Sequence, residues 1–310
     1  MNKKALYIAS AALLLLIAAC QNKDGAAPPP VSSPSAQQQT EKGDTSPQMN
    51  DTAPSQVPPD SKVQPIAAAD SSANQAPAAQ PASSDNKETV RQSASVPKLY
   101  KLNPKSYDIV PVDPSTTEKK VVLLTFDDGP KDHDMLESML TTLDKHHAKA
   151  IFFVNGYRVK QKPELLKLIL EHGQTIGNHS WDHIDLKKES KEKVAQQIDE
   201  VQKIVKDVTG ITPQFFRPPF GSGSDEVRAK VKENQMLFMT WSNGSLDWDM
   251  TTKNNNPDKI VSNVLEQLRP GSNILMHELP WTDKALDKLL TELEAKQYGF
   301  VDPASIDITP

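Results

Sequence analysis

The chain has 310 residues, of which 37% are apolar and 5% aromatic, and its formal net charge at pH 7 is −5. This modest charge is not gathered into a basic stripe, so we expect no nucleic-acid partner. Cys20 is the only cysteine. The folded part therefore has no disulfide and no thiolate ligand, and a bound metal must be held by histidine, carboxylate and water.

The N-terminus has the form of a secretory signal peptide, which we place at residues 1–19. Two lysines precede an apolar run over residues 5–19, and this run is shorter than the roughly 20 residues that a membrane-spanning helix needs. It ends in Ile-Ala-Ala-Cys at residues 17–20, which resembles a bacterial lipobox, where small residues precede a cysteine that becomes lipidated. We therefore expect an extracytoplasmic protein anchored to the cell membrane through Cys20. An uncleaved anchor with an incidental cysteine is the alternative.

Residues 20–115 are predicted to be the lipidated cysteine followed by a disordered linker. Pro, Ala, Ser and Gln dominate from residue 21 to about residue 97, and aromatic residues are absent there. Such a segment cannot bury enough apolar surface to offset the conformational entropy of its chain. About 90 residues of flexible coil span roughly 50–60 Å on average, so the linker lets a folded domain work well away from its anchor.

Residues 116–310 alternate short apolar runs with amphipathic stretches, which predicts one α/β domain. The expected strands cover residues 121–126, 150–154, 175–177, 214–217, 237–241, 273–277 and 299–301, and the expected helices cover residues 135–146, 163–172, 189–208, 225–234, 257–268 and 283–296. Repeated β-then-α units of this size favour a parallel sheet with crossover helices. Periodicity alone leaves an open sheet and a barrel as alternatives.

The first segment with candidate catalytic or metal-binding side chains is Leu-Thr-Phe-Asp-Asp-Gly-Pro at residues 124–130. Two adjacent carboxylates, Asp127 and Asp128, follow an apolar run and precede a Gly-Pro turn, so a strand delivers two acids to its C-terminal end. Neighbouring carboxylates repel each other, and a cation that neutralises one of them stabilises the pair. Taken alone, the segment is equally compatible with a solvated turn.

A pair of histidines follows about fifty residues later, within Gly-Asn-His-Ser-Trp-Asp-His at residues 177–183. If this stretch is helical, His179 and His183 lie at i and i+4 on one face, a spacing that lets two imidazoles reach one metal ion. Two histidines and one carboxylate with open coordination positions form an ordinary catalytic site for a divalent metal. The histidine pair alone is weak evidence for a metal site, and Asp127 and Asp128 strengthen that evidence.

Three further segments complete the pattern: Arg-Pro-Pro-Phe-Gly at residues 217–221, a stretch between two tryptophans at residues 241–248, and Leu-Met-His at residues 275–277. With the two earlier segments they resemble, in order, the five motifs of the polysaccharide deacetylase family (the NodB-homology carbohydrate esterases) over roughly residues 116–310. The resemblance implies a distorted, incomplete (β/α) barrel with parallel strands. Each motif falls at or just after the C-terminal end of an expected strand, where barrel enzymes place their chemistry.

The resemblance also implies a role for each site residue. The metal ligands would be Asp128, His179 and His183, and the metal would be a divalent ion, in the first place zinc, with cobalt, nickel or manganese as alternatives. The proton-transfer groups would be Asp127 as general base, paired with Arg217, and His277 as general acid. The expected oxyanion and substrate contacts are the backbone N–H of Phe220, the side chain of Leu275 against the acetyl methyl, Asp247, and Trp248, for which core packing is the alternative.

The implied activity is metal-dependent removal of N-acetyl groups from N-acetylhexosamine residues of a cell-wall polysaccharide. The tethered location favours peptidoglycan as the substrate, with chitin-like oligomers and O-acetylated polysaccharides as alternatives, and we expect a monomer. A wall-binding or wall-stabilising lipoprotein of the same fold, with weak or no hydrolysis, is the competing hypothesis.

Two positions depart from the family pattern. The fourth motif usually has an Asp that supports the catalytic histidine, and Gly244 aligns with it. The fifth motif usually continues His-Asp, whereas this chain has Glu278 after His277. If the alignment holds, His277 lacks a carboxylate partner, which lowers its pKa and weakens the acid step. The alternative is that Asp247 or Glu278 reaches the histidine instead.

Overall fold

The computed structural model describes residues 96–309. The expected signal peptide at residues 1–19, the lipidation site Cys20 and most of the expected linker lie outside the described residues. None of the helices within residues 96–309 is long and apolar enough to cross a membrane.

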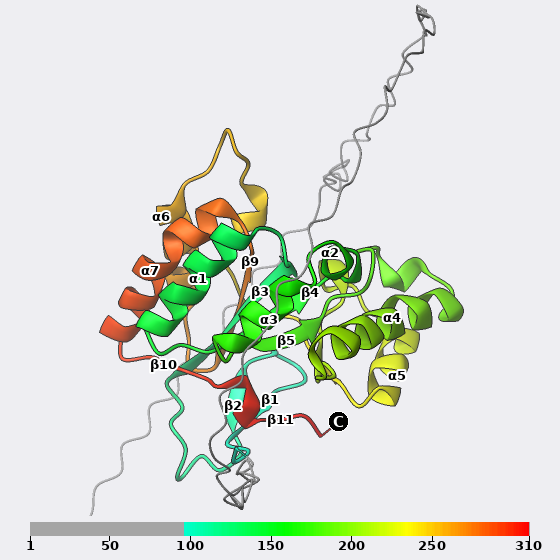
Figure 1. The fold of residues 1–310 in the computed structure, drawn as a ribbon. Coiled ribbons are helices and arrows are strands. Elements are labelled where there is room, and N and C mark those ends of the chain that lie inside the picture. The colour runs from blue at the N-terminus through cyan, green and yellow to red at the C-terminus, as the bar shows by residue number, and fades with distance from the viewer. Residues whose placement is uncertain (1–95, 310) are drawn as a thin grey trace, which may run out of the picture. The chain divides into compact units, whose positions relative to one another are not determined.

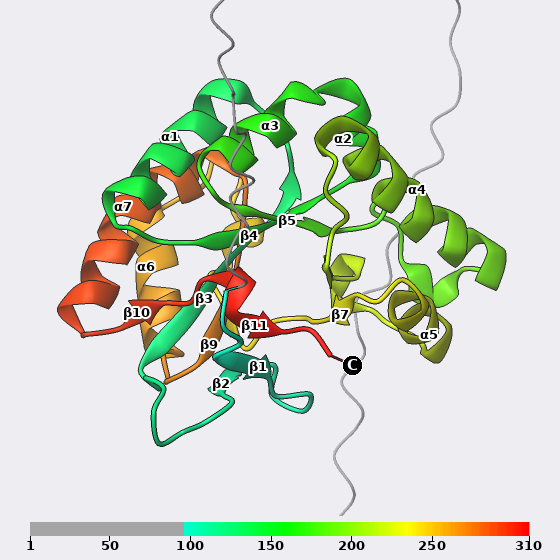
Figure 2. The same ribbon diagram turned by 60° about the horizontal axis from the view of Figure 1, so that its bottom comes forward.

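The main sheet has eight strands, and every pairing in it is parallel. The strands are β3 (Val121–Gly129), β4 (Ala150–Val154), β5 (Thr175–Asn178), β6 (Phe215–Phe216), β7 (Leu237–Phe238), β8 (Asn243–Gly244), β9 (Ser272–His277) and β10 (Gly299–Phe300). Their order is β7-β6-β5-β4-β3-β9-β8, with β10 beside β3. No pairing among the described residues joins β7 to β8, so the curled sheet stays open (Figure 2). The prediction of a distorted, incomplete barrel is confirmed.

Helices cover the outside of this sheet (Figure 1). They are α1 (His133–Lys145), α2 (Gly156–Gln161), α3 (Glu164–Glu171), α4 (Lys191–Thr209), α5 (Asp225–Glu233), α6 (Pro257–Glu266) and α7 (Pro280–Ala295). Side-chain caps begin four of them, from Asp132, Ser190, Ser224 and Asn256, because these side chains accept hydrogen bonds from the free N–H groups of a first turn. Gly210, with φ of +77°, ends α4 in the left-handed conformation that glycine adopts without strain.

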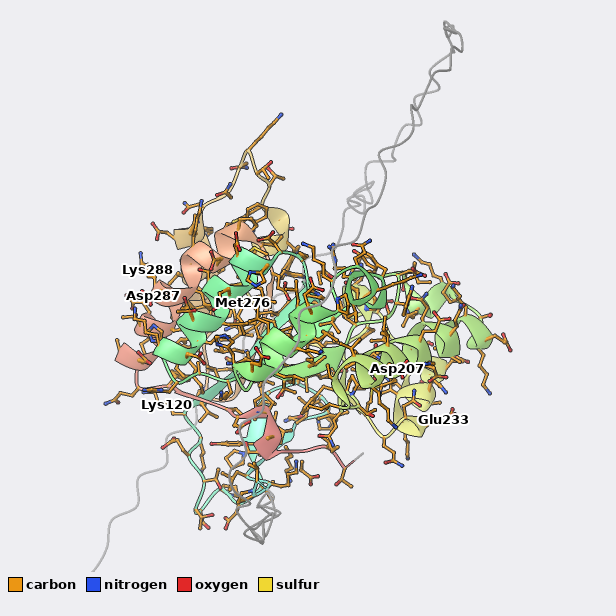
Figure 3. The ribbon with its side chains drawn as sticks, in the orientation of Figure 1. Lys120, Asp207, Glu233, Met276, Asp287 and Lys288 are labelled. Carbon is orange, nitrogen blue, oxygen red and sulfur yellow. The ribbon has the colours of Figure 1, made fainter. Side chains whose placement is uncertain are left out.

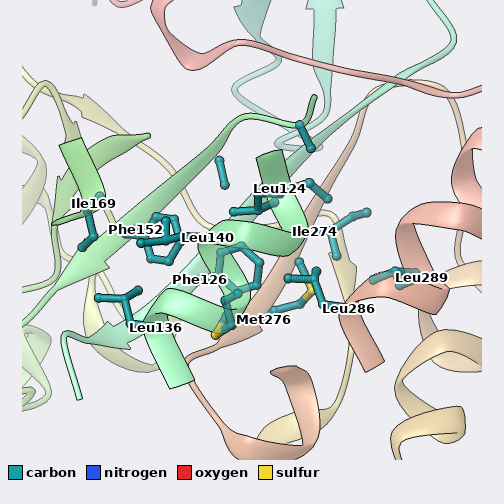
Figure 4. Close-up of a cluster of buried hydrophobic side chains, with 14 of the residues drawn as sticks. Leu124, Phe126, Leu136, Leu140, Phe152, Ile169, Ile274, Met276, Leu286 and Leu289 are labelled. Carbon is teal, nitrogen blue, oxygen red and sulfur yellow. The ribbon is translucent and has the colours of Figure 1, made fainter. Parts of the chain in front are cut away.

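Alternation along β3 divides its side chains between two clusters. Val122, Leu124 and Phe126 face the helices, and the ring of Phe126 stacks on Phe152 of β4 with their centroids 5.0 Å apart (Figure 4). Burying each such side chain stabilises the fold by about 1.5–3 kcal/mol. Val121 and Leu123 belong to a second cluster on the opposite face of the sheet. Thr125 and Asp127 continue this second series, since successive side chains of a strand alternate between faces.

A small three-stranded sheet adds to this inner cluster. It contains β1 (Tyr100–Leu102), β2 (Ile109–Pro111) and β11 (Ile306–Asp307) in the order β11-β1-β2, and Tyr100, Ile109 and Ile306 are buried in it. The predicted linker boundary at residue 115 is therefore wrong, because folded structure is present from Tyr100 onward. The strands were missed because each is only two or three residues long.

The strands and helices predicted from periodicity are confirmed, most with ends within two residues. The stretch from His179 to His183 is not helical, and α2 and the two-residue strand β8 were not predicted. His146 is the C-cap residue of α1. Its two ring nitrogens lie 2.9 Å from an oxygen of Asp287 and 3.0 Å from one of Glu294, both on α7 (Asp287 is labelled in Figure 3).

Candidate active site

The predicted site residues converge on one cavity at the C-terminal ends of the strands. Asp127 and Asp128 lie near the end of β3, His179 directly follows β5, and His277 ends β9. The cavity has a volume of about 410 Å³. It is lined by Asp127, Asp128, His179, His183, Pro218, Phe220, Gly221, Trp241, Trp248, Leu275 and His277.

Asp128, His179 and His183 form a possible metal site, in which one donor atom from each lies within 4.8 Å of the others. Oδ1 of Asp128 is 3.2 Å from Nε2 of His183 and 3.6 Å from Nε2 of His179. This carboxylate oxygen is buried and has no hydrogen-bond partner among the described residues. Burial raises the pKa of Asp128, but its electrostatic interactions with His179, His183, His277 and Lys131 more than offset this effect, so the pKa is lowered overall and the carboxylate is available as a ligand.

The two histidines present the nitrogens that a metal needs. Nδ1 of His179 lies 2.7 Å from the backbone carbonyl oxygen of Arg217. A carbonyl can only accept, so Nδ1 carries the proton and Nε2 keeps its lone pair toward Asp128. Burial lowers the pKa of His183, although the charge of Asp128 acts in the opposite direction. The neutral, ligating form of His183 is therefore favoured.

Left-handed backbone conformations explain how the metal-site loop is built without a helix. Within residues 96–309, nine non-glycine residues have positive φ, and five of them lie at the site or beside it: Asp128, Ser180, His183, Phe220 and Leu246, with φ between 56° and 67°. Residues with such φ values are uncommon and concentrate at functional sites. Ser180 and His183 bend the chain between the histidines, so both imidazoles reach Asp128 from a loop.

Asp127 and Arg217 form the buried ion pair that the sequence predicted. Nη1 of Arg217 donates to Oδ1 of Asp127 at 2.8 Å, and both side chains are almost completely buried. The second oxygen of Asp127 lies 3.6 Å from Nε2 of His179.

Asp247 supplies the carboxylate partner of His277, so the expectation drawn from Gly244 is wrong. Oδ1 of Asp247 accepts from Nδ1 of His277 at 2.8 Å, and Oδ2 accepts from the backbone N–H of His277 and from Thr282, each at 2.7 Å. Asp247 is fully buried, so its predicted role as a substrate contact is also wrong. At Gly244, an added Cβ would lie 3.0 Å from the ring of Trp248, which leaves little room for a longer side chain.

Glu278 points away from the histidine that precedes it. Its Oε2 accepts from the backbone N–H of Lys131 at 3.0 Å, and its Oε1 has no partner among the described residues. An added Cβ on Gly129 would lie 1.8 Å from that oxygen, so the absence of a side chain there makes room for the carboxylate. Burial raises the pKa of Glu278 to about 7.

Two partly exposed aromatic rings flank the cavity. Phe220 is 67% exposed, and its ring centroid lies 4.7 Å from that of His183. Trp248 is 39% exposed, and its centroid lies 5.6 Å from that of His277. Trp248 therefore lines the cavity and is not packed in the core, and its contact with a sugar ring stays a prediction. Leu275 is buried at the cavity surface.

Among the polar residues that contact the site and were not predicted from the sequence are Thr125, Asn273 and Thr282. Thr125 and Asn273 contact Arg217. The alternation of β3 was a usable signal for Thr125, because it precedes Asp127 by two residues and therefore shares its face. Thr282 lies in the first turn of α7 and reaches Asp247 across 35 residues of sequence, which no local pattern reveals.

Comparison with known proteins agrees with this geometry. The sequence family described as Polysaccharide deacetylase matches residues 114–239. The peptidoglycan-N-acetylglucosamine deacetylase PgdA of Listeria monocytogenes is 39% identical over 193 residues, which cover 62% of this chain and 40% of PgdA. The chain therefore matches about two fifths of the length of that relative.

Two solved structures are similar in both fold and sequence. The peptidoglycan deacetylase PdaC of Bacillus subtilis has a TM-score of 0.55 and 35% identity, over 62% of this chain and 91% of that one. A CE4 family pseudoenzyme from Bacillus anthracis has a TM-score of 0.57 and 30% identity, over 61% of this chain and 67% of that one. Similarity therefore extends both to deacetylases and to a protein described as a pseudoenzyme.

Proposed function

This chain belongs to the polysaccharide deacetylase family, and we propose that it is a metal-dependent hydrolase that removes N-acetyl groups from N-acetylhexosamine residues of peptidoglycan. One observation carries the proposal. The cavity holds two separate proton-transfer groups beside the metal donors, Asp127 paired with Arg217 and His277 paired with Asp247. Amide hydrolysis needs both a base and an acid, and each of these groups is held by an oppositely charged hydrogen-bond partner.

The donor set fits a divalent metal ion. Asp128, His179 and His183 would hold it, because two imidazole nitrogens and one carboxylate oxygen suit zinc, with cobalt, nickel or manganese as alternatives. The buried, unpartnered Oδ1 of Asp128 supports this assignment, since an orphaned carboxylate oxygen is costly unless a cation completes it. When bound, such an ion lowers the pKa of a coordinated water and polarises a carbonyl group.

Two residues of the chain carry out the two proton transfers: Asp127 accepts a proton and His277 donates one. Asp127 takes a proton from the attacking water as the water oxygen bonds to the acetyl carbon, and the hydrogen bond from Arg217 holds the carboxylate in place. Nδ1 of His277 donates to Asp247, so Nε2 is the nitrogen that carries the mobile proton. His277 gives this proton to the sugar nitrogen as the C–N bond breaks, which releases acetate and a free amine. Each such group contributes about 10²–10⁴ in rate.

Two further residues would bind the reacting group. The backbone N–H of Phe220 is proposed to donate to the oxygen that becomes negatively charged, as oxyanion-stabilising N–H groups do. Leu275 would contact the acetyl methyl group from the buried side of the cavity. Trp248 would pack against the sugar ring, since a partly exposed indole offers it an apolar face.

A non-catalytic, wall-binding role is the second candidate, favoured by the likeness to a CE4 family pseudoenzyme. The intact pairs at Asp127 and His277 favour hydrolysis. To test the choice, the zinc-loaded full-length chain is incubated with peptidoglycan, N-acetylchitooligosaccharides or O-acetylated polysaccharide, and the products are examined by mass spectrometry. The proposed function predicts the loss of acetyl groups from peptidoglycan amino sugars. Binding to peptidoglycan without any acetyl loss would support the second candidate instead.

We also propose that the protein acts outside the cytoplasm while anchored through a lipid on Cys20. The lipobox-like residues 17–20 and the preceding apolar run support this location. A tether of Pro, Ala, Ser and Gln would let the domain reach the wall beyond the membrane.

A further inference from the structure

We propose that Thr125 and Asn273 are positioning residues that hold the guanidinium of Arg217 in place against Asp127. The inference rests on the proposed function, because it assigns these residues to the base of the deacetylation reaction. Thr125 precedes Asp127 by two residues on β3, and Asn273 lies on β9, where Leu123 is its register partner. The inner face of the sheet thus brings both side chains below Asp127.

Arg217 is fully buried, so its hydrogen bonds can be counted. Nη1 donates to Asp127 at 2.8 Å and to Thr125 at 2.7 Å. Nη2 donates to the backbone carbonyl of Thr240 at 2.8 Å and to the side-chain oxygen of Asn273 at 3.2 Å. All four Nη–H groups therefore have acceptors, and only the Nε–H has none among the described residues.

The hydroxyl of Thr125 is oriented to accept from the arginine. Its Oγ1 lies 2.7 Å from the backbone carbonyl oxygen of Ile274 on the neighbouring strand. A carbonyl only accepts, so the single hydroxyl proton of Thr125 is donated there, and the lone pairs of Oγ1 are left for Nη1 of Arg217. Valine has the same shape without these lone pairs, so it would remove the acceptor and leave a buried N–H unpaired.

The amide of Asn273 is fixed in the same way. Its Nδ2 donates to the carbonyl of Thr240 at 3.1 Å, so its Oδ1 faces Nη2 of Arg217. The ring of Phe153 lies under the guanidinium, with Cζ of Arg217 4.4 Å from the ring centroid. The guanidinium plane is thus set by Phe153, and its rotation within the plane is set by Thr125 and Asn273.

These hydrogen bonds fix the position of the guanidinium relative to Asp127. An arginine side chain has many rotamers, and only a few of them place a buried guanidinium beside its hydrogen-bond acceptors. Without these two acceptors, Nη1 could turn away from Asp127 toward any other oxygen in reach. Misplacement of a reacting group by about 1 Å can cost roughly 10²-fold in rate. Neither residue lines the cavity, so each acts through Arg217 and not on the substrate.

The test compares Thr125→Val, Thr125→Ser and Asn273→Leu in the zinc-loaded full-length chain. We expect Thr125→Val and Asn273→Leu to lower kcat for deacetylation by roughly 10-fold or more, with KM and the zinc dissociation constant within about twofold of wild type. Thr125→Ser keeps the acceptor and should restore most of kcat. Thr142→Val is the control, because that hydroxyl donates to Ser138 within α1.

Two outcomes would overturn the inference: a folded Thr125→Val protein with wild-type kcat, or a Thr125→Ser protein as impaired as Thr125→Val. A second readout does not need turnover, and it keeps the inference testable if the proposed function fails. Guanidinium NMR of the wild type should resolve separate Nη1 and Nη2 signals for Arg217, since four hydrogen bonds slow rotation about its C–N bonds. Those signals should merge in Thr125→Val, and unchanged signals would contradict the positioning role.

Discussion

Oδ1 of Asp247 lies 2.8 Å from Nδ1 of His277, and the other oxygen of the same carboxylate accepts the backbone N–H of His277. The carboxylate therefore fixes both the ring and the main chain of the proposed acid. Burial alone lowers the pKa of His277, but the hydrogen bond and charge of Asp247 more than offset this effect, so the pKa lies above its ordinary value of 6.5. His277 is thus kept protonated into the pH range where an acid is needed.

Asp247→Asn should lower the pKa of His277, because it removes the charge that stabilises the imidazolium. We expect the alkaline limb of the kcat–pH profile to move to lower pH and kcat to fall by about 10²-fold or more. The measurement is kcat for acetate release at pH values from about 5 to about 10. The matched control is Asp249→Asn, which removes the charge of a neighbouring exposed carboxylate. An alkaline limb that does not move in Asp247→Asn would show that this carboxylate does not tune the acid.

Substitutions should distinguish the three metal donors from the general base Asp127 by their effects on bound zinc and on activity. His179→Ala and His183→Ala should each remove about one equivalent of bound zinc, because a three-ligand site cannot spare a ligand. Asp127→Asn should keep the zinc and lose the activity, since Asp127 is assigned to proton transfer. The bound metal is measured by elemental analysis after gel filtration. Loss of zinc in Asp127→Asn equal to that in the histidine variants would overturn this division of roles.

The predictable part of the site follows from strand geometry. Asp127 and His277 are register partners on β3 and β9, and both strands were evident as apolar runs that end in a polar residue. Arg217 follows a third such strand. Because parallel strands end at one edge of a sheet, placing their last residues in one cavity needed only the order of the elements.

The part that could not be predicted depends on backbone conformation and on distant contacts. Counting positions along the motif gave Gly244 the role that Asp247 holds, because a count of positions does not show which of the two faces His277 in the folded chain. In the same way, the spacing of His179 and His183 equals one helical turn, yet two left-handed residues bring them together in a loop. Thr282 reaches Asp247 from α7, a contact that only the folded chain creates.

Glu278 should make the stability of the fold depend on pH. Burial raises its pKa from 4.5 to about 7. The folded state therefore holds a proton that the unfolded chain releases, and the free energy of unfolding falls as the pH rises from about 4.5 to about 7. The loss is on the order of 3 kcal/mol above that range. Below the lower value both states are protonated, and Glu278 adds no pH dependence.

Glu278→Gln should remove this pH dependence of the free energy of unfolding, because glutamine does not titrate. Its side-chain oxygen can still accept the backbone N–H of Lys131. Denaturant unfolding of the metal-free chain at several pH values gives the comparison. We expect the variant to gain stability relative to wild type as the pH rises, and Glu266→Gln, in an exposed carboxylate, to show no such trend. A constant difference between Glu278→Gln and wild type from acidic to alkaline pH would mean that Glu278 does not retain its proton.

The membrane anchor is tested at one position. Cys20→Ser removes the only thiol of the chain, so we expect the protein to move from the membrane fraction to the soluble or secreted fraction. Immunoblotting of fractionated cells measures the change, and mass spectrometry of the mature N-terminus identifies the lipid. A Cys20→Ser protein that stays in the membrane fraction, or a mature chain that begins elsewhere, would refute the lipoprotein assignment.

Acetate release by the zinc-loaded, full-length chain acting on peptidoglycan tests the proposed hydrolysis most directly. The wild-type chain should release acetate over many turnovers and stop when a chelator removes the metal. Asp127→Asn and His277→Ala, each loaded with zinc, should release it about 10²–10⁴ times more slowly. A metal-replete wild type that releases no acetate, or an Asp127→Asn protein as active as wild type, would contradict the proposed hydrolysis.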